Sequence, residues 1–74
     1  LLFGYLVAGE AGGLGLIDRS GASAVPAQYT AVLLENERIA RVERNERFGY
    51  LRLADGRFIW KEEGFDTPLP GSPQ

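Results

Sequence analysis

The sequence predicts a mainly β protein, with short antiparallel strands in a meander or a small barrel built from two repeat units. Gly, Asp and Asn interrupt the chain every few residues, which is typical of short strands joined by tight turns. The segments between them are rich in aromatic and β-branched residues, which favour strands. With 74 residues, 45% of them hydrophobic, the chain predicts one small soluble domain, which we expect over residues 1–66.

Strands are expected wherever apolar residues run between two turn signals. In chain order they are predicted at residues 1–8, 15–18, 22–25, 29–35, 38–44, 47–53 and 57–61. The third is expected to end at Pro26, because proline cannot donate a hydrogen bond to a strand ladder. Turns are expected at Asn36-Glu37, Asn45-Glu46 and Asp55-Gly56. The last is the strongest hairpin signal, since glycine tolerates a positive φ in a two-residue loop.

Residues 35–48 are open to a second interpretation, because they are rich in helix-forming residues. The apolar positions of this segment would form only a thin stripe on a helix. Two Asn residues also lie where turns between short strands would fall. We therefore favour strands here, and helix is the alternative. Residues 67–74, by contrast, are rich in proline and have no hydrophobic pattern, which predicts a disordered tail.

An internal repeat relates the two halves of the chain. Residues 14–21 and 48–56 both have an apolar residue, a glycine, two apolar residues, a short polar stretch and a turn glycine, with one extra residue in the second copy. Gly15 and Gly49 are 34 residues apart, within the range typical of repeat proteins. Phe3-Gly4-Tyr5-Leu6 matches residues 48–51 closely, but it is too near Gly15 to begin a full copy. We expect it to be a remnant or a capping strand.

These residues resemble the bacterial WG (tryptophan–glycine) repeat. The resemblance is carried by Gly15-Leu16-Ile17-Asp18-Arg19-Ser20-Gly21, by Val25-Pro26-Ala27-Gln28-Tyr29, and more weakly by residues 39–51. The signature Trp-Gly is Leu14-Gly15 in one copy and Phe48-Gly49 in the other. The resemblance implies stacked β units with a binding or scaffold role, and it implies no catalytic residues. Because arrays of this kind usually need at least about three units, two units predict completion by the first strand or by a second chain.

Composition points away from several chemistries. The chain has no Cys and no His, so the usual thiolate and imidazole ligands and bases are missing. Four glutamates could supply an acid–base pair, and four arginines among them could contact phosphate: Glu35, Glu37, Glu43 and Glu46, with Arg38, Arg41, Arg44 and Arg47. Interleaved charges of both signs more often form a solvated face. We therefore expect no catalytic residue, no metal, no cofactor and no enzymatic activity.

The most informative side chains are the aromatic residues on either side of the Asp55-Gly56 turn. Alternate residues of two paired strands share one face of a sheet, so we expect these four to lie together: Phe48, Tyr50, Phe58 and Trp60. They could fill the core, form a ligand-stacking platform or form an interface between subunits. Core is the interpretation favoured by composition alone.

The function predicted from these observations is a non-catalytic interaction or scaffold module that self-associates as a homodimer or larger assembly. An unidentified protein partner is compatible with this prediction. A net charge of −2 disfavours nucleic acid, and there is no apolar run long enough to cross a membrane as a helix. A cytoplasmic location is expected. The alternative is a small β-barrel regulator that binds nucleic acid or a nucleotide through its Arg and aromatic residues.

Overall fold

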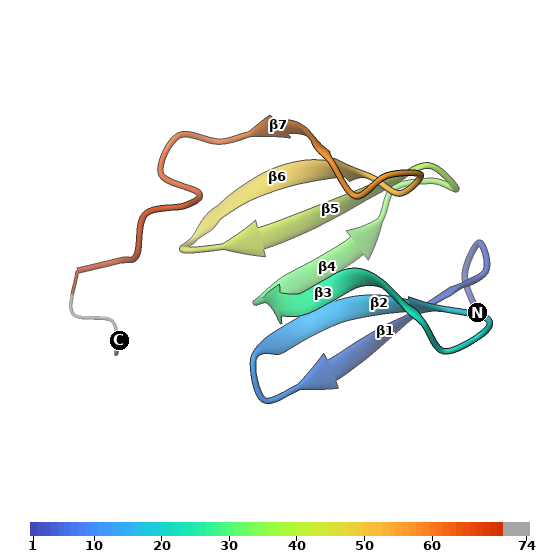
Figure 1. Cartoon of the computed structure of the whole chain (residues 1–74). Coiled ribbons are helices and arrows are strands. Elements are labelled where there is room, and N and C mark those ends of the chain that lie inside the picture. Colours follow the sequence, from blue (N-terminus) through green and yellow to red (C-terminus); the bar gives the residue numbers. More distant parts are fainter. Residues whose placement is uncertain (71–74) are drawn as a thin grey trace.

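The computed structural model describes residues 1–70 and consists of seven antiparallel strands in two sheets. Figure 1 shows the strands following one another across the molecule in chain order. Sheet A contains β1 (Tyr5–Glu10), β2 (Gly13–Asp18) and β3 (Ser23–Tyr29). Sheet B contains β4 (Ala31–Leu34), β5 (Ile39–Arg44), β6 (Arg47–Arg52) and β7 (Phe58–Lys61). The mainly β prediction is confirmed in its meander form, because the described strands do not close into a barrel.

The segment 35–48 forms strands and not a helix. This confirms the interpretation favoured above, in which its two Asn residues mark turns between short strands. The Asn36 side chain accepts hydrogen bonds from the backbone N–H groups of Arg38 and Ile39, at 2.8 and 3.0 Å, and so holds the turn before β5. Asn45 and Glu46 have φ angles of 55° and 60° and join β5 to β6 in a two-residue hairpin. Positive φ at both positions is the geometry of the type I′ turn, which matches the twist of paired strands.

Two predicted strand boundaries are wrong by four residues, whereas the others differ from the structure by at most two. Pro26 lies inside β3 and does not end it. Because β3 is an edge strand of sheet A, an outward-facing proline costs no ladder hydrogen bond there. The expected first strand at residues 1–8 begins instead at Tyr5, because Phe3 and Gly4 turn the chain with positive φ angles of 53° and 86°.

The two sheets contain equivalent three-stranded units, which confirms the internal repeat as a structural feature. The β1–β2 pairing, with Ala8 opposite Gly15, recurs 34 residues later in the β5–β6 pairing, with Val42 opposite Gly49. The register of the third strand is shifted after Leu16 in sheet A, and after Tyr50 at the equivalent place in sheet B. Sheet A has a further shift between Leu14 and Leu16, for which sheet B has no counterpart. The repeat therefore extends from the sequence to the hydrogen-bond register.

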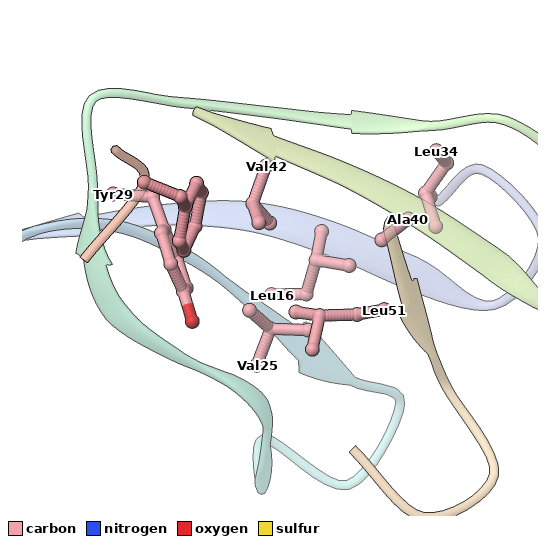
Figure 2. Packing of buried hydrophobic residues seen from close by; sticks show 8 residues of the cluster. Leu16, Val25, Tyr29, Leu34, Ala40, Val42 and Leu51 are labelled. Atoms are coloured by element: carbon pink, nitrogen blue, oxygen red, sulfur yellow. The ribbon is translucent and has the colours of Figure 1, made fainter. Parts of the chain in front are cut away.

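The hydrophobic core lies between the two sheets, and Figure 2 shows its side chains directed toward one another. Sheet A contributes residues of β2 and β3, including Leu16 and Val25, which are 1% and 2% exposed. Sheet B contributes residues of β4, β5 and β6, including Val42 and Leu51, at 0% and 2%. The eight buried residues are Leu16, Val25, Tyr29, Leu34, Ala40, Val42, Leu51 and Phe65.

After β7 the chain folds back onto this core. Phe65 is 1% exposed, and its ring centroid lies 6.2 Å from that of Tyr29. The Asn45 side chain donates a 2.8 Å hydrogen bond to the Phe65 carbonyl and fixes the segment against the β5–β6 turn. Residues 67–70 of the predicted tail form no strand or helix, and the rest of that tail lies outside the described residues.

Candidate functional site

Three of the four aromatic residues singled out in the sequence meet on the outer side of sheet B. Phe48 and Tyr50 alternate along β6, and Tyr50 is paired with Trp60 of β7. Their ring centroids are 6.0 Å apart for Phe48 and Tyr50, 5.5 Å for Phe48 and Trp60, and 6.3 Å for Tyr50 and Trp60. These separations are typical of favourable aromatic pairs. The three rings form one continuous cluster.

The cluster continues across β5 to β4. The Arg41 guanidinium lies over the Phe48 ring, 4.4 Å from its centroid, in a cation–π arrangement. Leu33 is paired with Arg41 across β4 and β5 and is 55% exposed. We call this surface the aromatic face and define it by Leu33, Arg41, Phe48, Tyr50 and Trp60. It spans all four strands of sheet B.

The aromatic face is open to solvent, and the prediction that its rings fill the core is wrong. Trp60 is 49% exposed, and Phe48 and Tyr50 are half-buried. The buried side of the same strands carries Leu51 and Val42, which leaves the rings on the opposite side. A shallow hollow of about 320 Å³ lies over β4 and β5 and includes Leu33 and Arg41 in its lining.

Phe58 is separated from the other three aromatic residues. The β6–β7 register shifts between Tyr50 and Leu51, so that Phe58 is paired with Leu51 on the core side of the sheet. Its ring packs edge-on against Phe65, with centroids 5.3 Å apart. Simple alternation along β7 would have placed Phe58 beside Trp60. The bulge adds a residue to one strand and breaks that alternation.

The arginines of residues 38–47 are divided between the two sides of sheet B, and they do not form a single basic stripe. Arg41 lies on the aromatic face, whereas Arg44 lies over the Tyr29 and Phe65 rings on the core side, at 5.3 and 4.6 Å. Arg38 is exposed beside Glu37, with 3.9 Å between their charged atoms. A phosphate backbone could not contact all of these guanidinium groups from one direction.

The carboxylates with shifted pKa values are held in structural ion pairs and turns. The pKa of Asp66 is lowered, mainly because Lys61 donates a 2.7 Å hydrogen bond to it, with a further contribution from Arg44. The pKa of Asp55 is lowered mainly by the Arg52 side chain. Lowered pKa values keep these groups ionised at neutral pH, which suits ion pairing and not proton donation.

Residues 1–70 contain no group of three Asp or Glu residues close enough together to hold a metal ion. The same part of the chain contains no helix with the length and apolar character needed to cross a membrane.

Comparison with known proteins found no match to a protein-family model, to a curated protein or to a solved structure. The likeness to the WG repeat therefore depends on the residues quoted in the sequence analysis alone. What the structure adds is the location of the aromatic residues and the equivalence of the two units.

Proposed function

We propose that this chain is a non-catalytic interaction module that associates with itself through the aromatic face. The observation that carries the proposal is the exposed ring cluster on sheet B, formed around Trp60 at 49% exposure. Aromatic and Arg side chains are enriched at the centres of protein interfaces, where they bury large areas with little loss of conformational freedom. Leu33, at 55% exposure, extends the apolar part of the surface.

The size of the chain supports the same proposal. A domain of 74 residues buries only about 60% of the surface that its unfolded chain exposes, and natural domains of this length are often stabilised by a partner subunit. The side chains left outside the core include several large apolar residues. Burying them against a second chain would add apolar area that the single chain does not bury.

Trp60 provides a direct test, because it is the single Trp of the chain and lies on the proposed interface. As the protein is concentrated, we expect its fluorescence emission to move to shorter wavelength while light scattering reports a rising mass. A fixed mass of 8.1 kDa with unchanged emission would contradict the proposal. A Phe3→Glu variant is the control and should associate like the unmodified chain. Phe3 is 51% exposed, close to the value for Trp60, but it lies in the N-terminal turn beside Asn36 and Arg38, away from the aromatic face.

The same probe separates self-association from nucleic-acid binding. Stacking of a base on Trp60 would quench its emission during titration with a mixed-sequence oligonucleotide at low salt. We expect no change in that titration, because the arginines are split between the two sides of sheet B. Quenching that is lost in Arg41→Gln would favour the nucleic-acid alternative.

A further inference from the structure

The repeated register shows that sheets A and B present equivalent faces in the same order. Leu16 and Val25 are paired in sheet A, and Tyr50 and Trp60 are paired at the equivalent place in sheet B. We call the face that carries these pairs the front of each sheet. The front of sheet B is the aromatic face.

The opposite side of each sheet, the back, is equivalent in the same way. In sheet B the back carries Val42 and Leu51, and in sheet A the corresponding positions are Ala8 and Ile17. The core is formed by the front of sheet A, with Leu16, packed on the back of sheet B, with Val42. The molecule therefore already contains one front-to-back interface between two such units.

One front and one back remain uncovered by residues 1–70, and they point away from each other, because the front of sheet A packs on the back of sheet B. The uncovered front is the aromatic face of sheet B. The uncovered back is that of sheet A, where Leu6 is 50% exposed and Ala8 and Ile17 are partly exposed.

The side-chain sizes on these two faces are complementary. Tyr50 and Trp60 are larger than Leu16 and Val25, which hold the same positions in the internal interface. The back of sheet A has Ala8 where the back of sheet B has Val42. A hollow of about 80 Å³ also opens there, lined by residues that include Ala8 and Ile17. The large rings of the aromatic face would thus meet smaller side chains and a hollow on the back of sheet A.

We propose that a second copy of this chain packs the back of its sheet A onto the aromatic face, repeating between molecules the contact that joins the two sheets within one. The proposal rests on the self-association proposed above and assigns its geometry. Because the two surfaces differ, the contact is heterologous, and each added molecule presents a new aromatic face. The assembly therefore grows head to tail unless rotation between successive copies closes it into a ring.

Two variants that each block one face test this geometry. Trp60→Glu places a carboxylate on the aromatic face, and Leu6→Glu places one on the back of sheet A. Both positions are about half exposed, at 49% and 50%, so each isolated domain should keep its fold. Each variant alone is expected to be monomeric. An equimolar mixture is expected to form a heterodimer that does not grow further, because it joins the intact front of Leu6→Glu to the intact back of Trp60→Glu.

Phe3→Glu, with the matched exposure of 51%, serves as the control and should assemble like the unmodified chain. Circular dichroism identifies any variant that fails to fold, and Trp60→Gln or Leu6→Gln then takes its place. If Leu6→Glu still self-associates while Trp60→Glu does not, the aromatic face pairs with itself and the head-to-tail geometry is overturned. If neither variant changes assembly, the interface lies elsewhere. A monomeric unmodified chain at about 1 mM would instead remove the self-association on which the geometry rests.

Discussion

Sheets A and B share the register of their first hairpin and the pairing that follows it, yet their equivalent front faces have different surroundings. In sheet A this face carries Leu16 and Val25, which are 1% and 2% exposed beneath sheet B. In sheet B it carries Tyr50 and Trp60, and Trp60 remains 49% exposed. The difference shows that position within the repeat determines where a side chain points, whereas the neighbouring unit determines whether it is buried.

The sharpest test of this comparison is to truncate equivalent residues in the two sheets. Leu16→Ala is expected to lower the free energy of unfolding by about 2–5 kcal/mol, because it leaves a cavity between the sheets. Tyr50→Ala should cost less than about 1.5 kcal/mol in the monomer, since its ring packs against Phe48 and Trp60 on the outer side of the sheet and not in the core. Urea unfolding at low protein concentration, followed by circular dichroism, measures both values. Equal losses would mean that the aromatic face stabilises the single chain as strongly as the core does.

The repeat glycines provide a second comparison. A Cβ atom added at Gly15 would lie 2.3 Å from the Val25 carbonyl oxygen, whereas one added at Gly49 would lie 3.0 Å from that of Trp60. Gly15→Ala is therefore expected to cost about 1–3 kcal/mol through displacement of β3. Gly49→Ala should cost less, because β7 needs to move only slightly. Thermal unfolding shows which of the two variants loses more stability. A larger loss of stability in Gly49→Ala would show that β3 adapts to the added methyl group more easily than β7 does.

The hairpin turns of the two units also differ. In sheet B, Glu46 has a φ of 60°, while neither residue of the equivalent Ala11-Gly12 loop in sheet A has a positive φ. Glu46→Gly should raise the free energy of unfolding by roughly 1 kcal/mol, because glycine enters the left-handed region without the steric cost borne by other residues. Asn45 is retained, so that its hydrogen bond to the Phe65 carbonyl persists.

The matched variant for this prediction is Glu43→Gly, which places glycine within β5 and is expected to destabilise. Chemical unfolding of both variants decides the question. If Glu46→Gly also destabilises, the native turn is stabilised by its Glu side chain and is not strained.

The smallest expected effect is a dependence of stability on pH. It distinguishes the segment that follows β3 from the segment that follows β7, because different side chains hold them in place. After β3, the Thr30 hydroxyl donates a 2.9 Å hydrogen bond to the Glu43 carbonyl and does not titrate. After β7, Asp66 accepts hydrogen bonds from Lys61 and Arg44, and its pKa lies below 3.8 in the folded protein. Because the folded pKa is lowered, this contribution to stability is present above pH 3.8 and is lost as the pH falls through the folded value.

Asp66→Asn removes that dependence. The difference in melting temperature between the unmodified chain and the variant should therefore shrink as the pH falls below 3.8. Taking the difference removes the effect of other carboxylates with lowered pKa, such as Asp18 and Asp55. Glu63→Gln is the control, since its exposed side chain makes no hydrogen bond in the described structure. A difference that stays constant with pH would show that Asp66 does not titrate as an ion-paired group.

Local signals in the sequence identified the strands and the repeat. Asn36 and Asn45 marked turns because their side chains and backbone preferences act over only a few residues. Gly15 and Gly49 marked equivalent positions because a neighbouring strand approaches each of them closely. Pro26 gave the wrong boundary, because its effect depends on whether β3 lies at an edge, and only the assembled sheet determines that.

The sequence by itself determined that this protein consists of short strands, that its second half repeats its first, and that four aromatic residues flank the Asp55-Gly56 loop. Only the tertiary structure decided which side of the sheet each aromatic residue occupies. Phe58 joins the core because a shift in the β6–β7 register places it opposite Leu51, while Trp60 is left outside. Alternation along a strand is local and can be read from the chain. The choice of the buried face depends on where sheet A packs, and that contact joins residues far apart in the sequence.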